Sequence, residues 1–446
     1  MLFLDRLRNL VTGLGGAKDK RTGNEFALNL LNRQQLDAMH RSDWMSRKIV
    51  DIIPQDMTRE WRRWQASKPQ IEALEKEEKR LALPIKVTAA LQAARLYGGA
   101  GLVMGIGNDD PIEPVRLDSI SRGDLKYAHV MTRYELTAGG QIIRDVESEW
   151  FGEPEYYNIT LDNGKAAQIH PSRVVRFLGA PIINRDVNPD GWGDSILQIV
   201  YDAVQNAASA QEHVAALIPE AKVDIIHIPD LAEHLATEES TKRLTDRIQY
   251  AQTIQSIFGK LLLEGDGKTQ GEVWQQKTIN FTAFPDLLRQ YLQVAAGAAD
   301  IPVTRLLGQS PSGMNATGES DMRNYYDNVG ARRSMELAHP LTRLDEVLIR
   351  SSTSERDEAI HALWPSLWQP QPKELAEIAK MRAETSEKYA NMAVMPDAAF
   401  SRAVQNQLVE SGDYPGLEQA LEEFGSEPDD MEEPAPEEED EPAEAE

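Results

Sequence analysis

A glycine-rich stretch, "LLGQSPSGMNATGESDMRNYYD" over residues 306–327, is the first candidate for chemistry. It contains the pattern Gly-x-x-x-x-Gly twice, from Gly308 to Gly313 and from Gly313 to Gly318. A phosphate-binding loop continues with Lys and then Ser or Thr, because the ammonium contacts the terminal phosphates and the hydroxyl contacts Mg²⁺. The first repeat continues with Met-Asn, and the second has Glu319 in the lysine position. A carboxylate there repels phosphate, so the stretch predicts a flexible loop that leads into a helix.

Two His-x-Ser motifs are the second candidate. They are His40 with Ser42 and His170 with Ser172. Two-histidine phosphoesterases use a pair of such motifs on facing strands, where the imidazoles exchange protons with phosphate oxygens. His40 falls in a helical pattern, which argues against that arrangement. A two-histidine phosphodiesterase stays open as an alternative function.

Other catalytic and metal-binding patterns are missing from the sequence. The chain of 446 residues has no cysteine, and its eight histidines lack the spacing of metal ligands. It also has no Gly-x-Ser-x-Gly elbow. We therefore expect no enzymatic activity, no metal and no cofactor.

Charge and hydropathy limit the partners. The net charge is −25, and the segment from Ser426 to the end carries twelve acids and no base, which predicts a disordered acidic tail over 426–446. An acidic body does not bind duplex DNA tightly, since that affinity rests on Lys and Arg. No apolar run approaches the 18 residues that span a bilayer, so no membrane partner is expected.

Residues 24–66 show apolar positions at helical spacing, and Pro54 is expected to break the pattern. Near its end, "WRRW" (Trp61 to Trp64) could stack on and clamp a nucleic acid. The other interpretation places the tryptophans in a core and the arginines toward solvent. A basic-aromatic nucleic-acid-binding protein is thus a second alternative function.

A further helix is expected around 85–97, followed by short β-rich runs from 98–107 to 173–179. Asp162-Asn163-Gly164 predicts a tight hairpin turn, and Gly139-Gly140 predicts another. These helices and β-rich runs predict one α+β domain with its sheet in the middle.

The second half of the chain is mostly helical. Two long helices flank a compact α+β unit over 222–281, and the second of them carries Pro285 in its first turn. The glycine-rich loop follows, and then a long helix that Pro340 should kink, because proline removes one intrahelical hydrogen bond. The sequence as a whole predicts a non-enzymatic, oligomeric α+β protein.

This order of elements resembles bacteriophage portal proteins of the prophage type, the head–tail connectors. The similarity rests on "SRKIVDIIPQDMTREW" (46–61), "DGWGDSILQIVYDAV" (190–204), the long block 296–327 and the downstream Pro340. In that family the fold has an α/β wing, a two-helix stem, a small α/β clip, a kinked long helix and a helical crown, and the subunits form a ring. By resemblance the chain divides into an N-terminal arm (1–24), wing (25–194), stem helix (195–221), clip (222–281), second stem helix (282–300), tunnel loop (301–318), kinked long helix with part of the wing (319–364), crown (365–425) and acidic tail (426–446).

The resemblance also implies site residues. The tunnel loop would face DNA in the channel through flexible and uncharged residues, namely Gly308, Gln309, Ser310, Ser312, Gly313, Met314, Asn315, Thr317 and Gly318. The alternative is a buried capping loop between two helices that does not contact DNA. The clip would dock the packaging terminase through Glu264, Asp266, Lys268 and Gln270.

The implied function is a structural one. A ring of twelve subunits at one capsid vertex would pass double-stranded DNA during packaging and ejection. Its partners would be the terminase large subunit, head-completion or adaptor proteins, and scaffold or capsid proteins. The protein would be assembled in the host bacterial cytoplasm and reside in the virion. Relatives can carry an additional C-terminal two-histidine phosphoesterase domain directed against a host cyclic-nucleotide defence. This chain has no histidine after His361, so that activity is not expected.

Overall fold

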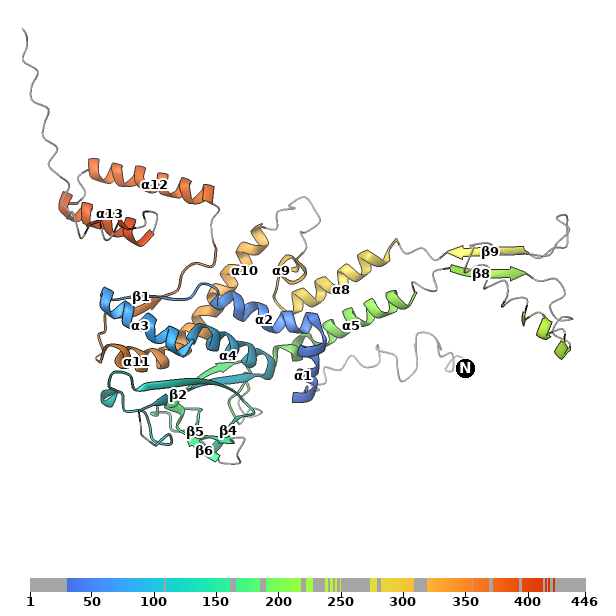
Figure 1. Cartoon of the computed structure of the whole chain (residues 1–446), viewed down its shortest axis with the longest axis horizontal. Helices are drawn as coiled ribbons and strands as arrows, with labels where there is room; N and C mark the ends of the chain where they lie inside the picture. Colours follow the sequence, from blue (N-terminus) through green and yellow to red (C-terminus); the bar gives the residue numbers. More distant parts are fainter. Residues whose placement is uncertain are drawn as a thin grey trace, which may run out of the picture. The chain divides into compact units, whose positions relative to one another are not determined.

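The computed structural model is a mixed α+β fold (Figure 1). It describes residues 30–107, 110–160, 166–184, 190–217, 222–227, 273–278, 282–308, 319–354, 356–368, 372–392 and 395–411, with a few positions within 237–249 and 414–421. The chain divides into two compact units, Met1–Leu367 and Trp368–Glu446.

A three-stranded antiparallel sheet lies in the middle of the first unit. Its order is β3 (Leu125–Thr132), β2 (Gly99–Ile106) and β7 (Val174–Leu178). Every residue of β2 is buried, because the sheet is covered on both faces. Alternate side chains therefore enter two different cores: Leu102 joins the larger one and Val103 the smaller one.

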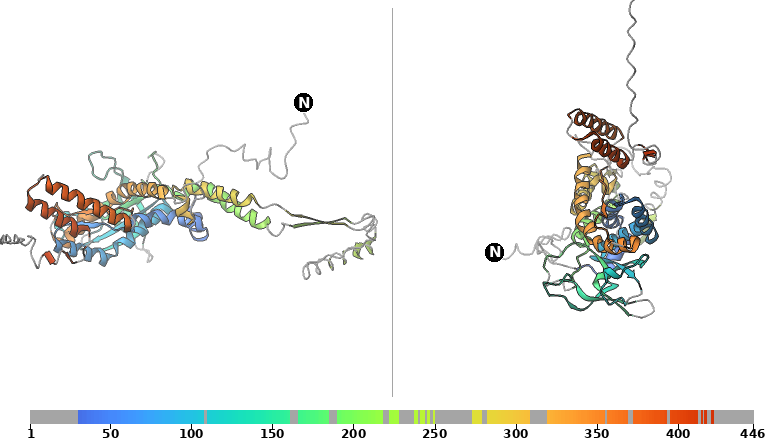
Figure 2. Two further views of the ribbon diagram at one scale, coloured as in Figure 1. Left: turned by 90° about the horizontal axis from the view of Figure 1, so that it is seen from above. Right: turned by 90° about the vertical axis from the view of Figure 1, so that its left-hand side faces the viewer.

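Helices form the larger core on one face of this sheet (Figures 1 and 2). They include α1 (Arg33–Ser42), α2 (Trp44–Thr58), α3 (Lys68–Leu81) and α4 (Leu83–Tyr97). The helix expected around 85–97 corresponds to α4, whereas α3 was missed. α3 is rich in acidic and basic residues, so its buried apolar stripe, which includes Leu74 and Leu81, is hard to recognise in the sequence.

The smaller core lies between the central sheet and a second one, made of β4 (Leu136–Ile142), β5 (Pro154–Thr160) and β6 (Ala166–Ile169). β5 and β6 pair as antiparallel neighbours, and the turn expected at residues 162–164 lies outside the described residues. The turn predicted at Gly139–Gly140 is wrong. Gly140 lies inside β4 with φ = +70°, where the register with β5 shifts, so this glycine forms a bulge instead of a turn.

The segment that leads from the central sheet into the next helix, α5 (Ile196–Leu217), packs closely against the backbone beside β2. The amides of Gly179 and Gly193 both donate to the carbonyl oxygen of Gly98, at 2.9 and 2.8 Å. A Cβ added at Gly99 would lie 2.2 Å from the Trp192 ring, so only glycine fits there. The Ser195 hydroxyl then accepts a hydrogen bond from the Leu197 amide and caps the start of α5.

α5 packs beside α8 (Phe284–Ala298), as Figure 1 shows. Between them in sequence, β8 (Lys222–His227) and β9 (Val273–Thr278) form an antiparallel pair. Pro285 lies in the first turn of α8, as predicted.

The chain continues through α9 (Val303–Leu307) to α10 (Glu319–Arg332). A π-helical segment, Arg333–Ala338, joins α10 to α11 (His339–Thr353), whose first turn holds Pro340. The helical run thus accommodates the proline with a wider turn directly before it. A short pair, β1 (Arg63–Gln65) with β10 (His361–Leu363), lies beside this run.

Pro54 does not end the first helical segment, contrary to the prediction. α2 continues to Thr58 because another residue replaces the hydrogen bond that the proline cannot make. The missing N–H leaves the Val50 carbonyl without its intrahelical partner. Buried Arg95 of α4 donates to that oxygen from Nε at 3.2 Å and to the Ile49 carbonyl from Nη2 at 2.9 Å.

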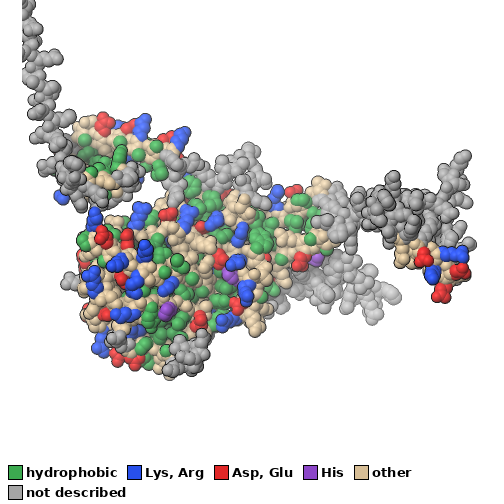
Figure 3. All heavy atoms as spheres, in the orientation of Figure 1, with side chains coloured by type: hydrophobic (Ala, Val, Ile, Leu, Met, Phe, Trp, Pro, Cys, Tyr) green, Lys and Arg blue, Asp and Glu red, His purple; other side chains and the backbone are tan. Residues whose placement is uncertain are grey.

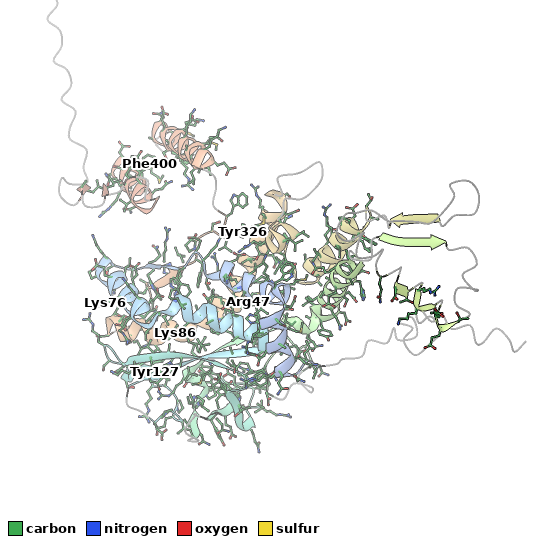
Figure 4. The ribbon with its side chains drawn as sticks, turned by 45° about the vertical axis from the view of Figure 1, so that its right-hand side comes forward. Arg47, Lys76, Lys86, Tyr127, Tyr326 and Phe400 are labelled. Carbon is green, nitrogen blue, oxygen red and sulfur yellow. The ribbon has the colours of Figure 1, made fainter. Side chains whose placement is uncertain are left out.

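The second unit contains α12 (Pro372–Asn391) and α13 (Asp397–Ser411). A groove of about 400 Å³ between them is lined mainly by apolar side chains, including Met381, Tyr389 and Phe400. Phe400 is labelled in Figure 4. Among the described residues of both units, no helix combines the length and apolarity that crossing a bilayer requires.

The Arg95 bridge yields a double-mutant test. Arg95→Met should lower the free energy of unfolding by about 3 kcal/mol, because two buried carbonyls lose a charged donor. Adding Pro54→Ala restores an N–H for Val50 and should recover part of that loss. Chemical denaturation followed by tryptophan fluorescence measures both changes.

Arg47→Met is the matched control, since Arg47 is an exposed residue of α2 (labelled in Figure 4) and should change stability by less than about 0.5 kcal/mol. Equal losses in the Arg95→Met single variant and in the double variant would contradict the bridge.

Candidate functional site: the base of the glycine-rich loop

The glycine-rich loop begins at the end of α9 and returns to the start of α10. Gly308 caps α9 in the left-handed conformation, with φ = +70°. The other residues expected to face DNA, from Gln309 to Gly318, lie outside the described residues. The terminase-docking residues predicted within 264–270 lie outside them as well. The structure therefore defines the frame that holds the loop.

A buried carboxylate anchors this frame. Asp56 of α2 accepts two hydrogen bonds from Arg305 of α9, at 2.9 and 3.1 Å, and a third from the Tyr325 hydroxyl of α10, at 2.7 Å. The hydrogen bond that Arg305 donates to Asp56 raises the pKa of Arg305, and burial together with the Asp56 charge raises the pKa of Tyr325. Arg305 is therefore charged and Tyr325 neutral at physiological pH, so both donate to the carboxylate.

Lys48, also on α2, fixes the end of α9. Its ammonium donates to the carbonyl oxygen of Leu306 at 2.7 Å, while it lies 5.5 Å from the centre of the Trp44 ring. A helix as short as α9 has few internal hydrogen bonds. A cation at its C-terminus supplies one of the missing partners.

The turn from α8 into α9 is held from the other side. Asp300, with φ = +58°, accepts hydrogen bonds from Asn328 at 2.7 Å and from Arg332 at 2.8 Å. Together with Asp56 these contacts attach both ends of the loop to α10 and α2. A groove of about 580 Å³ opens beside them, and its polar lining includes Asp300, Asp321 and Asn324. The described residues that line this groove include no Lys or Arg.

The two His-x-Ser motifs are not brought together by any contact of the described residues. His40 lies in α1, with Nε2 3.2 Å from the Asp51 carboxylate of α2. His170 follows β6, and its Nδ1 lies 2.9 Å from the Ser172 hydroxyl. Burial and the Arg173 charge lower the pKa of His170, so it is neutral at pH 7. Each imidazole thus has a local structural role.

The "WRRW" segment is neither a helix nor a clamp, and the expectation that its arginines face solvent is wrong for Arg62. Its Nε donates to Glu78 at 2.9 Å and its Nη1 to Asp345 at 2.6 Å, and the side chain is buried. Trp64 is buried too, and Trp61 packs edge-on against Trp364. Arg62 and Trp64 therefore lie in the core, and the partly buried Trp61 packs against it.

No group of three or more metal-ligating side chains comes together in the described part of the chain. Its polar clusters are salt bridges and hydrogen-bond networks with short contacts to arginines. The contacts of Asp56, Lys48 and Asp300 at the loop base hold the two ends of the loop.

The family model described as phage portal protein matches residues 34–388, most of the chain. The chain belongs to the phage portal protein family.

Two curated relatives have names that differ from the description of the family. A protein named anti-CBASS protein Acb1 from Caulobacter sp. (strain RHG1) is 51% identical over 437 residues, which cover 96% of this chain and 70% of the relative. A protein of the same name from Sphingomonas paeninsulae is 39% identical over 424 residues, covering 94% of this chain and 67% of the relative. Part of each relative therefore lies outside the match.

The fold is also similar to a chain in the neck of an empty gene transfer agent particle. The two share 14% identity and a TM-score of 0.50, with 89% of this chain and 98% of that chain covered. At this identity the likeness concerns the fold.

Sequence reasoning singled out the loop and missed the residues that hold it. Asp56 and Lys48 lie in the block 46–61, and Arg305 and Tyr325 in the block 296–327, the two segments on which the family resemblance rested. The available signal was a charged residue at an otherwise apolar position of a helix. Its partner lies 249 positions away, so only the fold reveals the pair.

The anchor can be tested by removing its charge. Asp56→Asn should lower the free energy of unfolding by about 2 kcal/mol, because Arg305 loses its charged acceptor. It should also accelerate amide hydrogen exchange in α9. Asp321→Asn, at an exposed position of the groove, is the control and should leave both unchanged. Equal exchange in α9 for the two variants would show that Asp56 does not hold the loop base.

Proposed function

We propose that this chain is the subunit of a portal ring at a capsid vertex, through which double-stranded DNA is packaged and ejected. Membership of the phage portal protein family carries the proposal. In it, residues 25–194 and 319–364 form the wing, α5 and α8 the stem, residues 222–281 the clip and residues 365–425 the crown. The ring would reside in the virion and have twelve subunits.

An apolar stripe on α8 supports the ring. Leu287, Tyr291 and Val294 are 44%, 38% and 62% exposed, although they follow the spacing of a buried helix face. Figure 3 shows hydrophobic side chains at the surface in this region. α5 already covers one side of α8, so this stripe needs a partner from outside the chain. A neighbouring copy supplies one at every position of a closed ring.

The loop base supports weak contact with DNA. Arg305 and Lys48 are both engaged by groups of the protein, and the described residues that line the adjacent groove include no cation. Duplex DNA carries about one charge per 1.7 Å, so free cations repeated around a ring would hold it tightly. Residues 308–318 would then touch passing DNA mainly through hydroxyl and amide groups.

The remaining partners follow from the proposed subunit. The clip would dock the terminase large subunit during packaging, with Glu264, Asp266, Lys268 and Gln270 as the proposed contacts. Head-completion or adaptor proteins would replace the terminase afterwards. Scaffold or capsid proteins would surround the wing during assembly.

Ring formation is the decisive experiment. The purified full-length protein should form rings with a central hole in negative-stain electron microscopy, with a mass near twelve subunits by mass photometry. A monomer that persists at high concentration, alone and with scaffold protein, would contradict the proposal.

Val294→Asp tests the stripe directly. It introduces a charge into an apolar contact and should weaken ring assembly at least about tenfold, while the thermal stability of the monomer stays the same. Arg289→Gln, at an exposed position on the opposite side of the same helix, is the matched control and should assemble normally. Normal assembly of Val294→Asp would mean that the stripe lies outside the subunit contact.

The name of the two curated relatives suggests a second candidate, an anti-CBASS activity. The separate surroundings of His40 and His170 argue against a phosphodiesterase built from those motifs. We expect the purified chain not to hydrolyse cyclic oligonucleotides, as measured by chromatography of the products. Hydrolysis that is lost in His170→Ala and kept in His361→Ala would favour the enzyme.

A further inference from the structure

The second unit exposes an apolar groove between α12 and α13. The two helices lie side by side (Figure 2), and side chains of both line the groove, among them Met381, Tyr389 and Phe400. Met381 and Tyr389 lie about two turns apart on one face of α12, and they are 57% and 49% exposed. Among the described residues of this unit, none is buried. Both helices therefore leave their apolar faces partly in water.

A pair of helices in this state needs a further apolar surface. α12 has 20 residues and α13 has 15, and helices of such length are marginal in water without tertiary packing. A third amphipathic helix laid along the groove would cover the exposed side chains of both, as in helix-in-groove recognition. The groove thus calls for an amphipathic helix whose apolar face matches it in length.

The N-terminal segment of the chain has this pattern. Residues 1–29 lie outside the described residues, so only their sequence is considered. In "MLFLDRLRNLVTGLGG" (1–16), a helical period of 3.6 places six apolar residues within one face of about 120°. They are Phe3, Leu4, Leu7, Leu10, Val11 and Leu14. Asp5, Arg6 and Arg8 fall outside this face, so the segment would form an amphipathic helix.

The groove and the segment match in length. Ile378 and Tyr389 both line the groove, and they are eleven positions apart on α12, or about 16 Å at 1.5 Å per residue. Phe3 and Leu14 are also eleven positions apart. Three helical turns of the segment would therefore lie along the full groove.

Charge favours the same pairing. Residues 1–24 contain five Lys and Arg against two Asp, whereas residues 368–446 contain 22 Asp and Glu against five Lys and Arg. In a ring, several copies of this acidic unit come together, and their like charges repel each other. A basic segment that one copy gives to the next offsets part of this repulsion. The neighbouring copy is therefore the favoured source of the segment.

We propose that residues 1–16 of one copy bind as a helix in the α12–α13 groove of a neighbouring copy. The apolar face of the segment covers Met381, Tyr389 and Phe400, and it leaves Arg6 and Arg8 at the margins of the groove. The choice of a neighbouring copy rests on the proposed ring. The match in polarity and length between groove and segment is independent of it.

Cysteine cross-linking tests the contact in the full-length chain, which has no cysteine of its own. Leu7→Cys and a tagged Met381→Cys chain are co-expressed and treated with a short bismaleimide reagent. We expect a covalent dimer of the two species on a denaturing gel. Glu387→Cys replaces Met381→Cys in the control and should give at least about tenfold less dimer, because Glu387 is exposed on the opposite side of α12.

Hydrogen exchange gives a second readout on the full-length chain. Leu7→Asp puts a charge into the apolar face of the segment and should accelerate amide exchange in α12 and α13 at least about tenfold, since the groove loses its occupant. Asn9→Asp introduces the same charge on the opposite side of the segment. It is the matched control and should leave exchange in both helices unchanged.

Three results would overturn the proposal. They are equal dimer yields for Met381→Cys and Glu387→Cys, equal exchange for Leu7→Asp and Asn9→Asp, and a cross-link that forms only within single chains of the double variant Leu7→Cys/Met381→Cys. Mass photometry of the same samples reports ring formation separately. Rings without the cross-link would therefore contradict the segment contact alone, and the cross-link without rings would contradict the ring alone.

Discussion

The buried guanidinium of Arg95 is the interaction on which the arrangement of the first unit depends. Arg95 completes α2 at the gap left by Pro54, and its own carbonyl oxygen accepts from the Ser195 hydroxyl at 3.4 Å, directly before α5. Burial lowers the pKa of Arg95 to about 10, with a further decrease from the Arg332 charge. The group is still charged at neutral pH, and its hydrogen bonds to backbone carbonyls offset part of the cost of burial. Arg95 thus connects α4 to α2 through its side chain and to the start of α5 through its backbone carbonyl.

α2 also contacts the helices at both ends of the glycine-rich loop. Pro54 and Asp56 are two residues apart, so the segment completed by Arg95 also presents the carboxylate that holds Arg305 and Tyr325. Lys48 makes a second contact from the same helix to the end of α9. These contacts hold both ends of the loop in place. The rigidity of the base comes from polar pairs within the chain.

The sequence predicted helices and strands more accurately than it predicted the effects of proline and glycine within them. β2, α5 and α8 were predictable because period and composition determine them locally. Pro54 misled because the donor that replaces its N–H is Arg95, 41 positions away. Gly139–Gly140 misled because a turn and a bulge need the same positive φ, and only strand pairing distinguishes them. For the candidate site, the loop was visible as a glycine pattern, whereas Asp56 was not, since its role exists only once α9 and α10 pack on α2.

In the first unit, the charged groups at the loop base are paired within the chain, whereas an apolar stripe of α8 is exposed. This difference bears on the proposed ring. At the loop base the charged groups Asp56, Arg305 and Lys48 find partners within the chain. The apolar stripe of α8 stays exposed, so apolar burial is the free energy left for association between copies. Such association depends little on salt, whereas binding of DNA by free cations depends on it steeply. A ring built from this subunit would therefore hold itself together under the same ionic conditions in which it lets DNA pass.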